Sequence, residues 1–341
     1  MSRMFEKGVF VIGEVAQAHD GSLGTAHAYI DVLADAGADA VKFQTHYAQY
    51  ESTLQEPWRV KFSYQDDSRY DYWRRMEFTE EQWSGLKEHA EQRGLVFMSS
   101  PFSIQAAEML DRLGMRVWKV ASGEVSDPWL LEFILKTGKP IIFSTGMSSY
   151  QKIEDYLKTI PRETELAIMQ CTTKYPSPPE DVGLNCMLDM MKRYGVPVGL
   201  SDHSGDIFAP LAAVSLGARV IETHICMNKM DFGPDVKASL TPDQFQQMVT
   251  GIRQITTMLE TKVDKDALAE QLCRSSTIFS KSVYAARDIE PGEIFTKENL
   301  ALKKPCYGIP AREVNAVLGK VAQKTYQKDE LITLENMGAM K

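Results

Sequence analysis

The chain has few cysteines, no paired cysteine motif and no long apolar run. Five cysteines are spread over 341 residues, and none of them belongs to a CxxC pair. An odd number without that spacing argues against a disulfide framework or a thiolate zinc site and indicates a reducing compartment. The N-terminal segment lacks the apolar core and small-residue cleavage site of a signal peptide. No run approaches the roughly 18 apolar residues that span a bilayer, so we expect a cytoplasmic protein.

The chain also lacks an excess of positive charge. Its formal net charge is −8 and its isoelectric point is about 5.4. This balance excludes a broad electrostatic attraction to nucleic acid or to an anionic membrane. A small anionic substrate would therefore have to be bound by local cations. The hydrophobic fraction of 44% is enough for one large core and a small additional module.

Short apolar runs alternate with amphipathic stretches through the first three quarters of the chain. Between the runs, the segment after Gly24 and the segment 79–92 have helical periodicity, and Thr79 is the expected N-cap of the second. Eight strands that alternate with helices over about 250 residues predict an α/β fold, a (β/α)8 TIM barrel. A doubly wound sheet is disfavoured because no G-x-G-x-x-G follows the first run. The predicted strands are 9–16, 40–46, 95–102, 116–124, 140–147, 166–173, 197–204 and 220–227.

The sequence changes in character after the helical segment 242–260. We expect a catalytic barrel over 1–262, a linker over 263–275 and a small β-rich module over 276–341. A module of this size has a limited core, so docking onto a barrel is expected. The long aromatic insertion 47–78, between the second and third strands, has two interpretations that both stay open: a lid over the barrel mouth or a surface excursion.

Polar residues gather at the C-terminal ends of the predicted strands, where TIM-barrel enzymes carry their working residues. Lys42 and Lys119 stand within apolar strands, where an unpaired ammonium group is costly to bury. Together with nearby serine hydroxyls they predict a site for a phosphate-bearing carboxylic acid. The alternative is a core salt bridge with a neighbouring glutamate. The serines are Ser100, Ser122, Ser144 and Ser201.

His203 and His224 end the seventh and eighth predicted strands. Adjacent parallel strands would bring the two imidazoles close enough to share a divalent ion. Two imidazoles with water or substrate oxygens suit Mn²⁺, Zn²⁺ or Fe²⁺ better than Ca²⁺. The alternative is that one or both are hydrogen-bonded core histidines.

Nine ordered segments of the chain resemble the bacterial sialic acid synthase family, whose members make N-acetylneuraminic, legionaminic or pseudaminic acid. The C-terminal segments SVYAARDIEPGEIFTKENL and LGKVA resemble its antifreeze-like (SAF) domain. The resemblance covers nearly the whole chain. The nine segments are GEVAQAHDGSL, GADAVKFQTH, SSPF, WKVASGE, PIIFSTGM, QCTTKYPSP, VGLSDHS, GARVIETH and FGPDVKASL.

This resemblance implies a nonulosonic acid synthase that condenses phosphoenolpyruvate with an N-acylated hexosamine and releases phosphate by C–O cleavage. It implies that His203 and His224 bind the metal, Mn²⁺ first, with Mg²⁺ or Co²⁺ as alternatives. It also implies a domain-swapped homodimer. The implied phosphoenolpyruvate ligands are Lys42, Ser100, Lys119, Ser122, Ser144, Thr173 and Ser201. The residues implied in sugar contact or proton transfer are Glu14, Gln44, Glu124, Tyr175 and Asp235.

The chain departs from the family pattern at three positions. Ala18 stands where asparagine is usual, and Thr173 stands where some members have asparagine. Lys304 stands where the SAF domain often has an arginine that reaches the partner subunit's site. It keeps the charge without the planar fork, or it is a solvated surface lysine. These departures concern the identity of the sugar more than the reaction. The rival functions are a synthase of a phosphorylated sugar, a non-catalytic sugar-binding barrel and a metal-dependent hydrolase.

Overall fold

The computed structural model describes residues 4–6 and 8–338, and the chain folds into two units, Met1–Glu260 and Thr261–Lys341. In the first unit, eight parallel strands stand in the order β3-β2-β1-β8-β7-β6-β5-β4. Strands β3 and β4, at the two ends of this order, also contact each other, so the barrel is nearly closed and the predicted TIM barrel is confirmed. The strands are β1 (Phe10–Ala16), β2 (Ala40–Thr45), β3 (Val96–Pro101), β4 (Trp118–Val120), β5 (Ile141–Ser144), β6 (Leu166–Cys171), β7 (Val198–Asp202) and β8 (Val220–His224).

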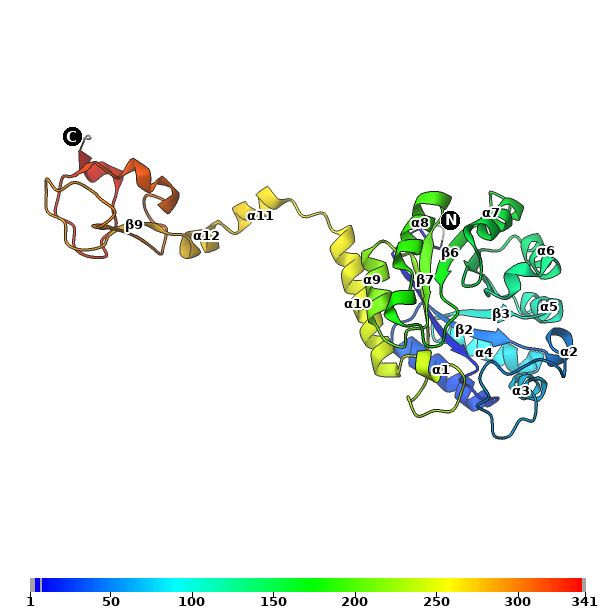
Figure 1. Ribbon diagram of the computed structural model, residues 1–341. Coiled ribbons are helices and arrows are strands. Elements are labelled where there is room, and N and C mark those ends of the chain that lie inside the picture. Colours follow the sequence, from blue (N-terminus) through cyan, green and yellow to red (C-terminus); the bar gives the residue numbers. More distant parts are fainter. Residues whose placement is uncertain (1–3, 7, 339–341) are drawn as a thin grey trace. The chain divides into compact units, whose positions relative to one another are not determined.

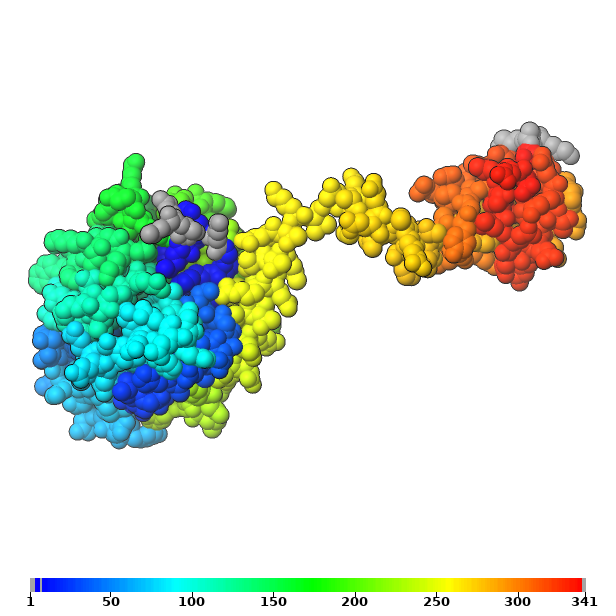
Figure 2. Space-filling model, turned by 180° about the vertical axis from the view of Figure 1, so that it is seen from behind, coloured from blue at the N-terminus to red at the C-terminus, as the bar shows by residue number. Residues whose placement is uncertain are grey.

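Helices cover the outside of the barrel (Figure 1). In the view of Figure 2, the yellow segment of α10 runs along the blue segments of the N-terminal part, consistent with its contact with α1. The helices are α1 (Leu23–Asp35), α4 (Glu80–Gln92), α5 (Ile104–Arg112), α6 (Pro128–Lys136), α7 (Tyr150–Thr159), α8 (Leu184–Tyr194), α9 (Phe208–Ser215) and α10 (Pro242–Glu260).

Local sequence accounts for where these helices begin and how they pack. The Thr79 hydroxyl accepts a hydrogen bond from the Gln82 backbone, and the Gln82 side chain accepts one from the Thr79 backbone, which confirms the predicted cap of α4. Helix α1 packs closely on β1 because Gly13 has no side chain. A Cβ at Gly13 would lie 2.1 Å from a methyl carbon of Leu33.

The alternation of side chains along β2 explains how the barrel acquires a polar mouth. Val41 and Phe43 pack in the apolar layer between strands and helices. The residues of β2 that alternate with these two point to the inside of the barrel; they are Ala40, Lys42 and Gln44. Ala40 belongs to the apolar cluster inside the barrel, whereas Lys42 and Gln44 line the pocket at the C-terminal end.

The fourth strand is shorter than predicted. The sequence predicted a strand over 116–124, but β4 ends at Val120. The backbone then turns, and Glu124 begins a 3₁₀ turn, η1 (Glu124–Ser126). Gly123 has helical dihedrals, so this segment cannot continue the extended strand. Glu124 therefore lies on a loop and not at a strand tip.

The insertion 47–78 has a small core of its own. It contains α2 (Ala48–Glu51) and α3 (Arg69–Met76), and Ser68 and Asp71 form a capping box at the start of α3. Four buried side chains hold the two helices together. They are Ala48, Tyr72, Trp73 and Met76.

The second unit is β-rich, as predicted, and has a separate apolar core. Strand β9 pairs antiparallel with β10, and β11 pairs antiparallel with β12. The predicted linker contains α11 and the start of α12, neither of which buries a side chain. Among the described residues, no helix is both long and apolar enough to cross a bilayer. The elements are α11 (Lys265–Gln271), α12 (Cys273–Phe279), β9 (Ser282–Ala285), β10 (Leu300–Lys303), η4 (Ala311–Ala316), β11 (Val321–Ala322), η5 (Leu334–Asn336) and β12 (Met337–Gly338).

Candidate active site

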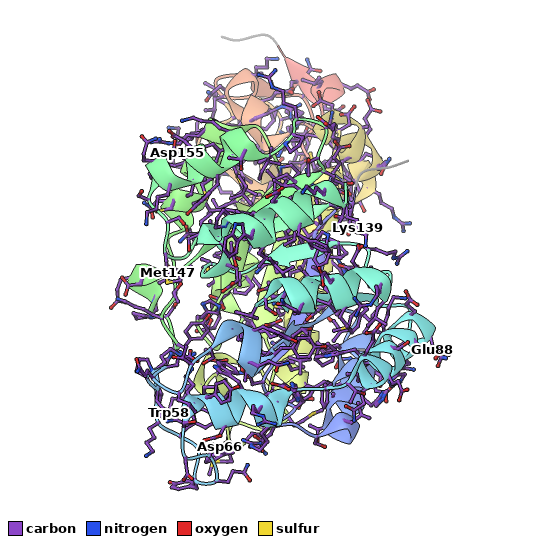
Figure 3. The ribbon with its side chains drawn as sticks, turned by 90° about the vertical axis from the view of Figure 1, so that its right-hand side faces the viewer. Trp58, Asp66, Glu88, Lys139, Met147 and Asp155 are labelled. Carbon is purple, nitrogen blue, oxygen red and sulfur yellow. The ribbon has the colours of Figure 1, made fainter. Side chains whose placement is uncertain are left out.

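A cavity of about 420 Å³ lies at the C-terminal ends of the barrel strands. All barrel residues predicted for the site line it. In Figure 3, Trp58 of the insertion and Met147 of the loop after β5 lie along the same edge of the barrel, and both line this cavity. The predicted residues that line it are Glu14, Lys42, Gln44, Ser100, Lys119, Ser122, Glu124, Ser144, Thr173, Tyr175, Ser201, His203, His224 and Asp235.

Lys304 belongs to the second unit. Its ammonium nitrogen lies 5.4 Å from the centre of the Phe279 ring, as in a cation–π contact. Its role at an active site stays a prediction.

Two buried lysines and two buried glutamates form a charge cluster in the cavity. Lys42 Nζ lies 2.6 Å from Glu14 Oε2 and 3.8 Å from Glu222 Oε1. Lys119 Nζ lies 3.1 Å from Glu222 Oε1. Each of these side chains is at most 5% exposed. The salt-bridge interpretation of the lysines is therefore confirmed. Each lysine also lines the cavity, and the site for a phosphate-bearing carboxylic acid stays a prediction.

The register of the parallel strands creates this cluster. Glu14 stands opposite Lys42 on β2 and opposite His224 on β8. Ser201 on β7 stands opposite Glu222. The sequence alone assigned no role to Glu222. The available signal was its spacing from His224, because residues two apart in a strand share a face.

The environment sets different protonation states in this cluster. Burial raises the pKa of Glu14 to about 7, and Glu222 adds to the rise while Lys42 opposes it. Burial also acts to raise the pKa of Glu222, but Lys119 and Lys42 outweigh it and lower the value to about 2. Glu222 is therefore ionised at neutral pH, whereas Glu14 is able to take up or release a proton there.

Hydroxyl groups surround the lysines. Ser100 Oγ lies 3.4 Å from Lys42 Nζ, and Ser201 Oγ donates to Glu222 Oε1 at 3.2 Å. Ser144 Oγ is buried and has no hydrogen-bond partner within the described part of the chain. A buried hydroxyl without a partner is unfavourable unless a ligand completes it. Ammonium groups with convergent hydroxyls are the donors that phosphate and carboxylate oxygens require.

Gly146 allows two further hydroxyl groups of the cavity, those of Thr173 and Ser122, to lie close together. A Cβ at Gly146 would lie 2.4 Å from Thr173 Oγ1 and 2.9 Å from Ser122 Oγ. The Gly146 backbone N–H donates to Ser122 Oγ at 3.0 Å. Any larger residue at this position would push Thr173 and Ser122 apart.

His203 and His224 lie side by side, with ring centres 5.2 Å apart. Burial lowers the pKa of each to about 3, and the positive charge of neighbouring groups adds to the effect. His203 Nδ1 lies 2.8 Å from the carbonyl oxygen of Thr172. Because a carbonyl only accepts, Nδ1 carries the proton of the neutral ring and Nε2 has a free lone pair.

This donor set fits a divalent ion in part. Within residues 4–6 and 8–338, no group of three or more His, Cys, Asp or Glu side chains is arranged to hold a metal. Two neutral imidazoles would therefore need water or substrate oxygens to complete the coordination of an ion such as Mn²⁺.

Glu124 lies at the edge of the cavity, on η1. Burial raises its pKa to about 7, and the negative charges of Glu51 and Asp127 add to the rise. Gln44 donates to Glu14 Oε1 at 2.8 Å. The cavity thus has two carboxyl groups that titrate near neutral pH, in two different surroundings.

The insertion 47–78 forms one wall of the cavity. It is therefore not a simple surface excursion, which was one of its two interpretations. His46, which precedes it, lies between the rings of Trp73 and Phe102, with ring centres 4.0 and 4.3 Å away. His46 Nδ1 lies 2.7 Å from Glu51 Oε1. The sequence alone assigned no role to His46. The period of two that places Lys42 and Gln44 inside would also have placed His46 there.

Arg59 of the insertion is a further residue to which the sequence alone assigned no role. Its Nη2 donates to Asp235 Oδ1 at 2.6 Å, and its guanidinium carbon lies 4.4 Å from the centre of the Tyr175 ring. No local pattern in the sequence indicates this contact, because Arg59 and Asp235 are 176 residues apart.

Comparison with known proteins gives a consistent result. The NeuB family model matches residues 29–264, and the SAF domain model matches residues 280–336. The chain is 36% identical to the N,N'-diacetyllegionaminic acid synthase of Campylobacter jejuni, over 96% of this chain and 99% of that protein. It is 35% identical to the pseudaminic acid synthase of Campylobacter jejuni, over 94% of each. The crystal structure of an N-acetylneuraminic acid synthetase from Leptospira borgpetersenii, in complex with citrate, superposes with a TM-score of 0.69 at 27% identity, over 79% of this chain and 91% of that one.

Proposed function

Because the chain belongs to the NeuB family, we propose that it is a nonulosonic acid synthase that condenses phosphoenolpyruvate with an N-acylated hexosamine. C3 of phosphoenolpyruvate would attack the aldehyde carbon of the open-chain sugar, whose oxygen takes a proton. Water would add to C2, and the resulting intermediate would lose phosphate as its C2–O bond breaks. The observation that carries the proposal is the buried pair of lysines, each facing both a glutamate and the cavity.

The charge cluster suits the binding of phosphoenolpyruvate. Lys42 and Lys119 would offer their remaining N–H donors to the phosphate and carboxylate groups. Ser144 Oγ, which lacks a partner among the described residues, would donate to the same ligand. Glu222, which also lines the cavity, contacts both ammonium groups and holds them in place.

Glu14 and Glu124 suit proton transfer. Each has a pKa of about 7, so each exists in both protonation states at neutral pH. One of them would protonate the aldehyde oxygen and the other would accept a proton from the attacking water. The structure supports both groups equally for these two tasks.

We propose a divalent metal, Mn²⁺ first, as cofactor. His203 and His224 are the side chains that would hold it, through nitrogen atoms such as the free Nε2 of His203. When bound, such an ion supplies Lewis-acid polarisation of a carbonyl oxygen. Tyr175 stacks on His203 at 4.0 Å and keeps that ring in place.

The experiment is phosphate release from phosphoenolpyruvate with Mn²⁺ and a panel of sugars. The panel contains N-acetylmannosamine, the diacetamido-trideoxy hexoses that precede legionaminic and pseudaminic acids, and arabinose 5-phosphate. Release with an acylamino sugar, abolished by a chelator and by His224→Ala, is the expected result. His89→Ala, on α4 outside the barrel, is the matched control and should retain full activity.

Two other outcomes would contradict the proposal. Turnover of arabinose 5-phosphate alone would favour a synthase of a phosphorylated sugar. Binding of phosphoenolpyruvate without release of its phosphate in the presence of any sugar would favour a non-catalytic sugar-binding barrel. A domain-swapped homodimer, in which Lys304 would face the partner's cavity, stays a prediction.

A further inference from the structure

The rim of the cavity contains an arginine that no step of the proposed reaction uses. Arg59 is 39% exposed, whereas Lys42 and Lys119 are 3% exposed, so its charge lies nearer the mouth than the two lysines. It belongs to the insertion, and its two partners belong to other loops. Tyr175 follows β6 and Asp235 follows β8. Arg59 therefore joins three loops at one edge of the cavity.

The contacts hold the guanidinium group in a defined orientation. Asp235 Oδ1 accepts from Arg59 Nη2 at 2.6 Å, and the Tyr175 ring lies beneath the guanidinium carbon at 4.4 Å. Tyr175 itself stacks on His203 with ring centres 4.0 Å apart. The cation is thus placed one aromatic layer away from the histidine pair, where the reacting end of the sugar would lie.

The remaining groups of this pair are a donor and an acceptor side by side. Arg59 has N–H donors beyond the one that Asp235 uses, and it has no acceptor. Asp235, when ionised, only accepts, and Oδ2 has lone pairs beyond the contact with Arg59. The N–H and C=O groups of a trans secondary amide point in opposite directions, so the amide meets this pair through its carbonyl oxygen, which accepts from Arg59 while Asp235 holds the guanidinium group in place. A hydroxyl oxygen also accepts, but the carbonyl oxygen of an acyl group extends farther from the sugar carbon and so reaches farther toward a cation at the rim.

The charge of the rim argues against a phosphorylated sugar in this position. Two cations line it, Arg59 and Arg69, and both are paired with carboxylates. Arg69 Nε lies 3.3 Å from Glu56 Oε1. Further carboxylates of the same cavity, Glu51 and Glu124, have no arginine or lysine within ion-pair distance in the described part of the chain. A phosphate dianion would meet more negative than positive charge here.

We propose that Arg59 is a specificity-determining residue and that its guanidinium group, held by Asp235, binds the carbonyl oxygen of an acylamino group of the sugar. This inference rests on the proposed function and names a feature of its sugar subsite. It assigns a task to the insertion, which brings the guanidinium group to a place that the barrel strands do not reach. The aromatic side chains of the same wall, Trp58 and Phe62, offer an apolar surface to the acyl chain.

The test compares N-acetylmannosamine with mannose, which differ in the acylamino group. In Arg59→Gln, the ratio of kcat/KM for the two sugars should fall by roughly tenfold to a hundredfold, since hydrogen bonds to charged groups are lost. KM for phosphoenolpyruvate should stay within about twofold, because Lys42 and Lys119 are untouched. Arg59→Lys keeps the charge without the fork and should recover only part of the ratio.

Arg74→Gln is the matched control, an exposed arginine of α3 in the same insertion, and should leave both constants unchanged. A wild-type ratio in Arg59→Gln would overturn the inference. An equal rise of KM for N-acetylmannosamine and for phosphoenolpyruvate would also overturn the inference, because it would indicate general damage to the cavity.

A failure of the proposed function would be visible separately. If the wild type releases no phosphate with any sugar, the synthase is wrong, and the inference is then tested by calorimetric titration of N-acetylmannosamine. Weaker binding by Arg59→Gln than by wild type would support the acylamino subsite. Equal binding, or no binding by either protein, would contradict it.

Discussion

Three carboxyl groups of the cavity have pKa values that their surroundings move in opposite directions. Glu14 and Glu124 are raised to about 7, mainly by burial. Glu222 is lowered to about 2, because Lys119 and Lys42 outweigh the effect of burial. The same residue type thus serves as a fixed anion in one place and as a titrating group in two others. At the scale of single residues, charge neighbours decide the role.

Glu124→Gln should change how stability depends on pH. The folded pKa is raised from 4.5 to about 7, so between these values the folded chain keeps a proton that the unfolded chain has lost. As pH rises through this window, the wild type should therefore lose stability relative to Glu124→Gln, on the order of 1–2 kcal/mol after allowance for solvent screening. Urea unfolding at about pH 4 and about pH 8 measures this difference.

The control for this prediction is Glu163→Gln, at an exposed position. Its free energy of unfolding should run parallel to that of the wild type at both pH values. If the free energy of unfolding of Glu124→Gln also runs parallel to that of the wild type, the carboxyl group of Glu124 does not have a pKa near neutral pH.

At the scale of elements, the insertion is positioned by its packing and not by its sequence pattern. Its two helices are short and share a small core, and His46 links that core to the end of β2. Trp73 is 8% exposed and stacks on His46. Because this core is small, the folded structure of the insertion depends on single large side chains such as Trp73.

Trp73→Ala should loosen the insertion and leave the barrel folded. Truncation of a buried tryptophan costs roughly 3–5 kcal/mol, which exceeds what a small cluster is able to absorb. We expect limited proteolysis to cut within 47–78 faster than in the wild type. Trp129→Ala, at a tryptophan that is 72% exposed on α6, should leave the cleavage rate unchanged. Cleavage first in the barrel helices would contradict this account.

At the scale of the whole molecule, each of the two units has its own core. The barrel has an outer apolar layer and an inner cluster, and the second unit has a third cluster that includes Phe295 and Tyr326. All five tryptophans lie in the first unit. Tryptophan fluorescence therefore reports the unfolding of the barrel alone.

Phe295→Ala should destabilise the second unit selectively. Phe295 is 1% exposed, and its truncation costs roughly 3–5 kcal/mol in a module whose core is small. Amides of β9 and β10 should lose protection from hydrogen exchange, while the midpoint of tryptophan fluorescence stays in place. Tyr307→Ala, at a side chain that is 70% exposed, is the control. A matching shift of the fluorescence midpoint would show that the units unfold together.

The sequence by itself determined the barrel, the β-rich second unit and the barrel residues that line the cavity. The barrel, the second unit and the strand-end residues follow from local signals: apolar runs, capping residues such as Thr79, and polar residues at strand ends. Tyr175 and Asp235 followed only from the resemblance to the sialic acid synthase family. Parallel strands place their C-terminal ends at one mouth, so residues such as Lys42 and His203 were predictable without knowledge of any contact.

Only the tertiary structure decided which of these residues pair and what the loops contribute. Glu222 pairs with both lysines because of the strand register and the closure of the barrel. Glu124 leaves the strand that the pattern predicted. Arg59 meets Asp235 across 176 residues. Periodicity describes neighbours along the chain, whereas these contacts depend on how distant loops pack, and no local pattern encodes that.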